Sequence, residues 1–122
     1  MDRIKIILDI FERIITPEHL PYFGSRGDGV TAEYLCDRVK ITEDEKKEFN
    51  ITEQTIPGGG KTYTWDDSIK TEKEFELPLP EYALLKKGLE LMDKTERLNI
   101  KDKRITAFFD KVMAVEIKKE DD

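Results

Sequence analysis

The sequence is poor in the residues that most chemical sites need. It has one cysteine, Cys36, and one histidine, His19, among 122 residues. A disulfide needs two cysteines, so no disulfide framework can form within the chain, which is typical of a reducing compartment. Zinc sites and catalytic triads combine several such side chains, so we expect His19 to be an ordinary loop residue beside Pro17. On these grounds we expect no cofactor and no metal.

Long apolar runs and an excess of positive charge are also missing. No stretch approaches the ~20 apolar residues of a membrane-spanning helix. The first residues, MDRIKIILDIFERII, are charged throughout and lack the apolar centre of a secretion signal. We therefore expect a cytoplasmic protein with no membrane partner. The net charge is −6, and because a negative protein repels phosphate backbones, no direct nucleic-acid binding is expected.

The charged and apolar residues that are present predict one folded domain over residues 1–122. Charged residues make up 39% of the chain and apolar residues 38%, but the apolar ones recur at regular spacings. Solubility alone explains a net charge of this size. A protein that imitates nucleic acid would also be acidic, with its acids on one continuous face, and that alternative stays open.

Helices are expected at both ends of the chain. Apolar residues at helical spacing predict an amphipathic N-terminal helix over residues 1–15, which the pair Thr16-Pro17 would end. Two C-terminal helices are predicted, one with Pro80 in its first turn and one from about residue 105 onward. Glycine is unfavourable inside a helix, so Gly88 indicates close approach of a neighbouring backbone. Residues 118–122 are expected to fray.

The middle of the chain changes to strand-type sequence. Residues 50–56 and 61–66 are rich in β-branched and aromatic residues and flank a Pro-Gly-Gly-Gly turn at 57–60, which predicts a β-hairpin. Residues 73–78 predict a third strand that would complete a small antiparallel sheet with the hairpin. Helices followed by strands and then helices predict an α+β fold.

Residues 16–30 are predicted to form a loop, because they hold two prolines and three glycines. We interpret the Arg-Gly-Asp tripeptide at 26–28 as a surface turn whose glycines supply positive φ angles. Tyr22, Phe23 and Arg26 are of the types that dominate binding hot spots, so they are the candidate protein-contact residues.

Two short helices should follow that loop, over residues 31–39 and from Thr42 to about Phe49. The spacing between Thr42 and Glu45 is that of a capping box, in which each residue satisfies a backbone amide of the other.

No string in the sequence amounts to a catalytic motif. Residues 55–62 end in Gly-Lys-Thr like a phosphate-binding loop, but Thr55 replaces the first glycine and strand-type sequence follows where a helix is needed. We interpret the string as a hairpin turn. Carboxylates are abundant but not grouped as a cleft would require, so a small carboxylate-based or metal-dependent enzyme is kept as an alternative and no catalytic residue is named.

Several segments between residues 15 and 112 resemble a loosely defined group of small acidic proteins of bacterial phages and prophages. They are ITPEHLPYFGS, DRV at 37–39, ITEDEKKEFNI, WD at 65–66, EFEL, EYALLKKGLELMDK and FFDKV. The chain departs from the group in its N-terminal helix and its Pro-Gly-Gly-Gly turn.

The resemblance implies a function but carries over no catalytic residue. Such proteins typically bind a host or phage protein, so the expectation is a non-enzymatic modulator or inhibitor that binds its partner stoichiometrically in the host cytoplasm. The alternative is a structural or assembly accessory protein of the virion. From the residues themselves, a homo-oligomer through the N-terminal helix is a further hypothesis.

Overall fold

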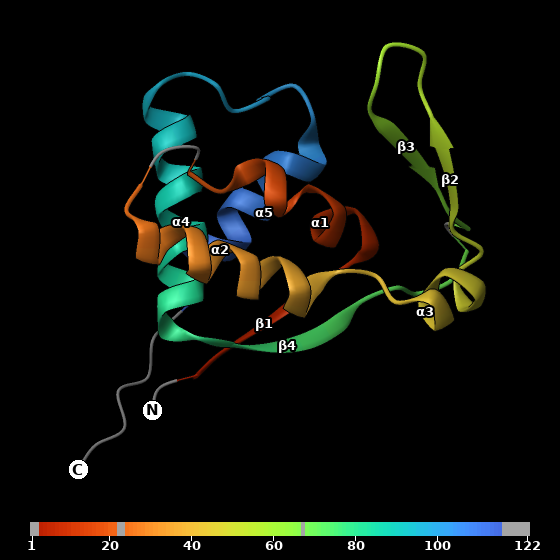
Figure 1. Ribbon diagram of the computed structural model, residues 1–122, viewed down its shortest axis with the longest axis horizontal. Coiled ribbons are helices and arrows are strands. Elements are labelled where there is room, and N and C mark those ends of the chain that lie inside the picture. Colours follow the sequence, from red (N-terminus) through yellow and green to blue (C-terminus); the bar gives the residue numbers. More distant parts are fainter. Residues whose placement is uncertain (1–2, 22–23, 67, 116–122) are drawn as a thin grey trace.

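The computed structural model describes residues 3–21, 24–66 and 68–115, which adopt an α+β fold in two parts (Figure 1). We call residues 42–66 the arm and the other described residues the body. The arm contains α3 (Glu43–Glu48), β2 (Thr52–Thr55) and β3 (Lys61–Thr64). The body contains β1 (Arg3–Leu8), α1 (Ile10–Ile15), the 3₁₀ helix η1 (Pro17–His19), α2 (Arg26–Val39), β4 (Lys73–Pro78), α4 (Leu79–Lys94) and α5 (Lys103–Met113).

The expected N-terminal helix over residues 1–15 is wrong for its first half, because Arg3–Leu8 form strand β1. Ile4, Ile6 and Leu8 are buried and alternate with exposed residues, which is the period of a strand with one face on a core. Ile7, which a helical spacing of the apolar residues would bury, is 48% exposed. The isoleucine-rich run fits the spacing of a helix and that of a strand equally well. Pairing with β4 stabilises the strand.

A helix does follow, but it is short and begins where a cap permits. The Asp9 carboxylate accepts a hydrogen bond from the Glu12 amide at 2.8 Å, and the Glu12 carboxylate accepts one from the Asp9 amide at 3.0 Å. This capping box starts α1 at Ile10. Ile4, Ile6 and Leu8 of β1, in the segment proposed for an oligomer contact, therefore lie in the core of their own chain.

Strand β4 confirms the prediction for residues 73–78 and corrects its partner. It pairs antiparallel with β1, from Arg3 opposite Pro78 to Leu8 opposite Lys73, whereas β2 and β3 form a separate two-stranded sheet. The expected three-stranded sheet is therefore wrong. Phe75 and Leu77 lie on the same face of the ladder as the buried apolar residues of β1, whereas the hairpin strands are mostly polar. Burial of apolar side chains therefore favours pairing of β4 with β1, although β1 is far away in the sequence.

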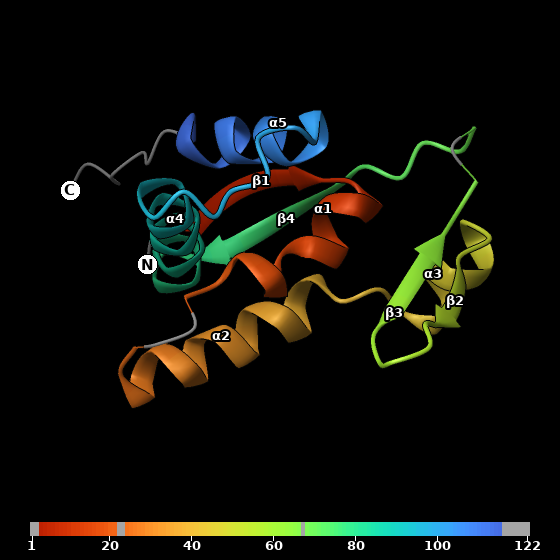
Figure 2. The same ribbon diagram turned by 90° about the horizontal axis from the view of Figure 1, so that it is seen from above.

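The core lies between the β1–β4 pair and the helices of the body. Figure 1 shows these helices on one side of the two strands, which agrees with the single buried face of each strand. Figure 2 shows the same helices from above, with α5 and α2 on opposite sides. The Tyr82 hydroxyl of α4 donates to the Val112 carbonyl of α5 at 2.7 Å and joins the two helices. The buried apolar cluster comprises Ile4, Ile6, Leu8, Ile15, Leu35, Val39, Phe75, Leu77, Tyr82, Leu85, Leu89, Phe108 and Val112.

Helices α4 and α5 confirm the two C-terminal helices, and Gly88 confirms the expected close approach. A Cβ at this position would lie 2.2 Å from the His19 carbonyl oxygen, so only glycine lets η1 pack against α4. Pro80 lies in the first turn of α4 as predicted. The tail at 118–122 lies outside the described residues.

The predicted loop over residues 16–30 is too long, because α2 begins at Arg26. Ser25 accepts from the Asp28 amide at 3.1 Å, and the Asp28 carboxylate accepts from the Ser25 amide at 3.3 Å. The Arg-Gly-Asp tripeptide is thus the first turn of a helix and not a surface turn. Among the described residues the glycines with positive φ are those at 58–60, so the glycines at 24, 27 and 29 do not play the expected part.

Candidate protein-binding surfaces

The arm is attached to the body through a buried ion pair. The Arg13 side chain of α1 is 1% exposed and donates to both carboxylate oxygens of Glu45 in α3, at 2.6 and 2.7 Å. It also donates to the carbonyls of Val39 and Lys40, each at 2.9 Å. Its guanidinium carbon lies 5.1 Å from the centroid of the Phe75 ring. Two charge-assisted hydrogen bonds to Glu45 therefore hold α3 against the body, and the other two hold α1 to the end of α2.

This contact changes the acidity of Glu45. Its pKa falls to about 2, mainly because Arg13 hydrogen-bonds to the charged carboxylate, with a smaller contribution from the backbone of Thr42. The predicted capping box between Thr42 and Glu45 is confirmed. One carboxylate therefore both starts α3 and holds it to α1.

The hairpin segment of the arm begins and ends at nearly one place. The Asp66 amide donates to the carbonyl of Phe49 at 3.2 Å, and the Phe49 side chain is buried. Above this point, Lys61 pairs with Glu53 at 2.7 Å, and Lys46 of α3 approaches Glu53 at 3.7 Å. These contacts connect the hairpin to α3.

The hairpin prediction at the Pro-Gly-Gly-Gly turn is confirmed. The Ile56 amide donates to the Gly60 carbonyl at 3.0 Å, and the Gly59 amide donates to the Ile56 carbonyl at 3.1 Å. The three turn glycines have φ between 96° and 100°, a region that other residues rarely adopt. The Gly-Lys-Thr string thus runs into strand β3, as its interpretation as a hairpin turn requires.

The hairpin has two different faces, both largely exposed. All four residues of β2 are exposed, and so are those of β3 apart from half-buried Tyr63. The register places Glu53 opposite Tyr63 on one face, while the other face carries only uncharged polar side chains. Those uncharged residues are Thr52, Gln54, Thr62 and Thr64.

A cleft of about 600 Å³ separates the arm from the body. Half-buried Ile14 and Ile41 contribute apolar surface from the body side, and Ile51 contributes it from the arm. Lys61 and Tyr63 line it from the hairpin, and both belong to β3. The cleft is large enough for a peptide segment or a small ligand.

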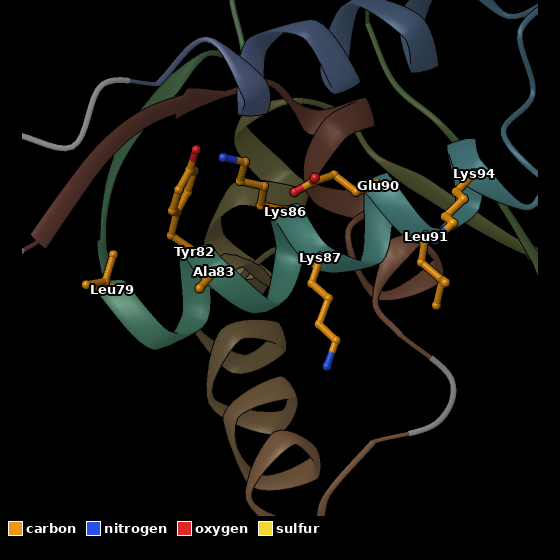
Figure 3. Close-up of a pocket in the computed structure, with 8 residues that line it drawn as sticks. All are labelled: Leu79, Tyr82, Ala83, Lys86, Lys87, Glu90, Leu91 and Lys94. Carbon is orange, nitrogen blue, oxygen red and sulfur yellow. The ribbon is translucent and has the colours of Figure 1, made fainter.

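A second, shallower groove of about 410 Å³ runs along the outer face of α4 (Figure 3). Leu79 and Ala83 lie along it, and Leu91, 45% exposed, projects at its far end. Lys86, Lys87 and Lys94 border it with Glu90. The Lys87 amine lies 3.8 Å from the Asp28 carboxylate of α2. The groove is amphipathic and locally basic on an acidic chain, which makes it a rival surface.

Of the three contact residues expected from the sequence, the structure describes one. Tyr22 and Phe23 lie outside the described residues, and Arg26 is exposed at the start of α2. The structure brings Arg26 to neither the cleft nor the α4 groove. The cleft was not found from the sequence, because the Arg13 to Glu45 pair that forms its base spans 32 positions.

His19 is more deeply placed than a loop residue, which corrects that expectation. Its ring is buried, its Nδ1 lies 2.7 Å from the Ile15 carbonyl oxygen, and its edge faces Phe108 with centroids 6.0 Å apart. It packs η1 onto α5. Burial raises the pKa of the half-buried Cys36 thiol, with a further rise from Asp37, so the reactive thiolate is disfavoured there.

Searches of other chemistry and of known proteins add no site. Over the ranges 3–21, 24–66 and 68–115, no three or more His, Cys, Asp or Glu side chains are grouped as a metal ion would need. None of the helices in those ranges has the length and hydropathy to cross a bilayer. No family model, curated protein or solved structure matches the chain. The function is therefore inferred from geometry.

Proposed function

We propose that the protein acts by stoichiometric binding to another protein and that the arm is its recognition element. The observation that supports this is an exposed hairpin on a fixed base. β2 buries none of its residues, yet the buried Arg13 holds the adjoining helix through two hydrogen bonds to the partly buried Glu45. Elements that project from a rigid scaffold are where proteins most often place recognition.

The energetics of the hairpin favour the same proposal. Ordering one residue costs roughly 1–2 kcal/mol of backbone entropy, and an isolated two-stranded hairpin is marginal in water. This hairpin adds no residue to the buried core cluster. The hairpin contributes little to the core but is held in one position. Binding a partner explains such a segment better than a structural role in the body does.

The resemblance to small phage and prophage proteins gives the proposed class of partner. In this proposal the partner is a host or phage protein in the host cytoplasm, and the chain modulates or inhibits it by occupying a surface. Neither catalysis nor a cofactor is needed for that action. No residue of the arm is assigned a chemical role beyond contact.

The test compares three baits in affinity capture from the cell that encodes the protein. The first bait is the full chain. In the second, two glycines replace residues 51–65, a short link that suits the hydrogen bond between Phe49 and Asp66. The third carries Leu91→Glu in the α4 groove. We expect the full chain and the Leu91→Glu chain to retain one partner at equal stoichiometry by native mass spectrometry, and the shortened chain to lose it.

Folding of the shortened bait is checked by circular dichroism, since the body should keep its helices. Two results contradict the proposal. One is a partner that the shortened chain retains, and the other is a partner lost only when Leu91 is changed, which would move recognition to α4. Failure of every bait to enrich a protein also counts against it.

A further inference from the structure

We infer that an extended segment of the partner enters the cleft between arm and body and adds to the hairpin as a third strand beside β3. This inference rests on the proposed function and specifies its binding mode. It follows from which backbone groups of the hairpin are already used, which edge faces the cleft, and what lines the opposite wall.

The turn fixes which backbone groups point outward. Ile56 and Gly60 form a hydrogen-bonded pair at the turn. Bonded and non-bonded pairs alternate along an antiparallel ladder. Thr55 opposite Lys61 and Glu53 opposite Tyr63 are therefore non-bonded pairs. The N–H and C=O groups of Lys61 and Tyr63 point away from β2, along the outer edge of β3.

That edge faces the cleft. Lys61 and Tyr63, the two residues with outward backbone groups on β3, are the hairpin residues that line it. Figures 1 and 2 both show β3 nearer to the body than β2. Within the described residues, no backbone hydrogen bond joins these two residues to another element. A row of such groups is a template for another extended backbone.

The opposite wall defines the side chains that the segment should carry. Ile14, Pro17 and Ile41 form an apolar wall from the body. Alternate residues of an added strand point to opposite sides, so apolar residues at every second position would meet this wall. Apart from Arg13, whose charge Glu45 neutralises, the lining carries Lys40, Lys46 and Lys61 against Glu18 and Asp37, although the chain as a whole carries −6. A segment poor in lysine and arginine fits best.

The second edge of the hairpin supplies a matched control. Thr55 lies directly opposite Lys61, and its N–H points outward in the same way, but from the β2 edge, which does not line the cleft. Proline at either position removes an outward N–H and leaves the ladder between β2 and β3 intact. The two substitutions therefore differ mainly in which edge they block.

The experiment uses short random peptides displayed on yeast and selected against the full chain. Selected peptides are then titrated against Lys61→Pro, Thr55→Pro and Lys61→Ala, the last being a control for loss of the side chain. We expect Lys61→Pro to weaken binding about tenfold or more, as loss of a buried backbone hydrogen bond would, with little change for the other two variants. Amide exchange of Tyr63 should slow in the bound state.

The outcomes separate this inference from the proposed function. Equal weakening by Thr55→Pro, peptides that bind the α4 groove, or peptides rich in basic residues would overturn the strand addition. If partner capture still depends on the arm in those cases, the proposed function stands and only the binding mode is wrong. A dimer seen by light scattering that Lys61→Pro abolishes would assign the edge to a second copy and would also overturn the inference.

Discussion

The body and the arm each contain a two-stranded antiparallel ladder, but the two ladders are built from different side chains. In β1 and β4 every second residue is apolar and buried, with Leu8 and Leu77 fully inaccessible. In β2 and β3 the side chains are threonine, glutamine and charged residues at the surface, together with half-buried Tyr63. Backbone pairing is common to both, so burial and not hydrogen bonding decides which ladder supports the fold.

The largest effect on the difference between arm and body is expected from removing the ion pair that joins them. Arg13→Ala leaves Glu45 with the longer ion pair to Lys73, at 3.9 Å, and removes the Arg13 donors from the carbonyls of Val39 and Lys40. Loss of one partner of a buried ion pair costs about 3–5 kcal/mol, and we expect a loss of that order in urea unfolding. Trp65, the one tryptophan of the chain, follows β3 and reports arm release by fluorescence.

The matched control for that variant is Lys5→Ala. Lys5 and Glu74 form an exposed pair at 3.9 Å across β1 and β4, and such surface pairs contribute less than about 1 kcal/mol. If Lys5→Ala and Arg13→Ala destabilise equally, the view that one buried ion pair anchors the arm is wrong.

Hydrogen exchange measures the difference between the ladders without mutation. Amides of the β1–β4 ladder should open only with global unfolding, whereas those of Gln54 and Thr62 should open with the arm alone. We expect the arm amides to exchange about 100-fold faster after correction for intrinsic rates, as locally opening segments do. Equal protection of the two ladders would show that body and arm unfold as one unit.

Gly88→Ala should damage the body and spare the arm. Its Cβ would meet the His19 carbonyl oxygen at 2.2 Å, so η1 must shift, and overpacking of this kind costs about 1–3 kcal/mol. Gly29→Ala in α2 meets nothing within 4 Å and should be neutral or stabilising. The native Trp65 emission should be the same in both variants, which differ only in melting temperature.

Acid should loosen the arm with the smallest effect of the four. The pKa of Glu45 is about 2 in the folded protein, below its ordinary value of 4.5. The stability from this carboxylate is therefore fully present above about pH 5 and is lost as the pH falls toward 2. Glu45→Gln, measured by Trp65 fluorescence against pH, should remove that part of the acid dependence. An unchanged acid profile in Glu45→Gln would assign it to other carboxylates.

Local signals in the sequence predicted local structure well. The capping box of Thr42 with Glu45, the glycine turn at 57–60 and the helix from Pro80 each depend on residues near in sequence, and each is confirmed. The close approach at Gly88 is confirmed too, but the sequence did not indicate that His19 makes it. The same type of signal was overlooked at Ser25, whose spacing to Asp28 marks the start of α2.

Features that depend on residues far apart in the sequence could not be predicted. The isoleucines of residues 4–7 satisfy helical and strand spacing alike, and only β4 selects between them. The partner of Arg13 could not be read from the sequence either, because Glu45 comes from α3, 32 positions away. The cleft follows from that pairing, so the sequence alone indicated neither the cleft nor the strand edge along it.

The pairing of β1 with β4 also determines when the body can be completed during synthesis. Arg3 lies opposite Pro78, so the first strand leaves the ribosome long before its partner has been translated. Contacts of such high sequence separation form late, whereas the arm hairpin closes over a few residues as soon as it emerges. The more buried ladder is thus assembled after the arm hairpin, and until β4 is made Ile4, Ile6 and Leu8 have no strand to pair with.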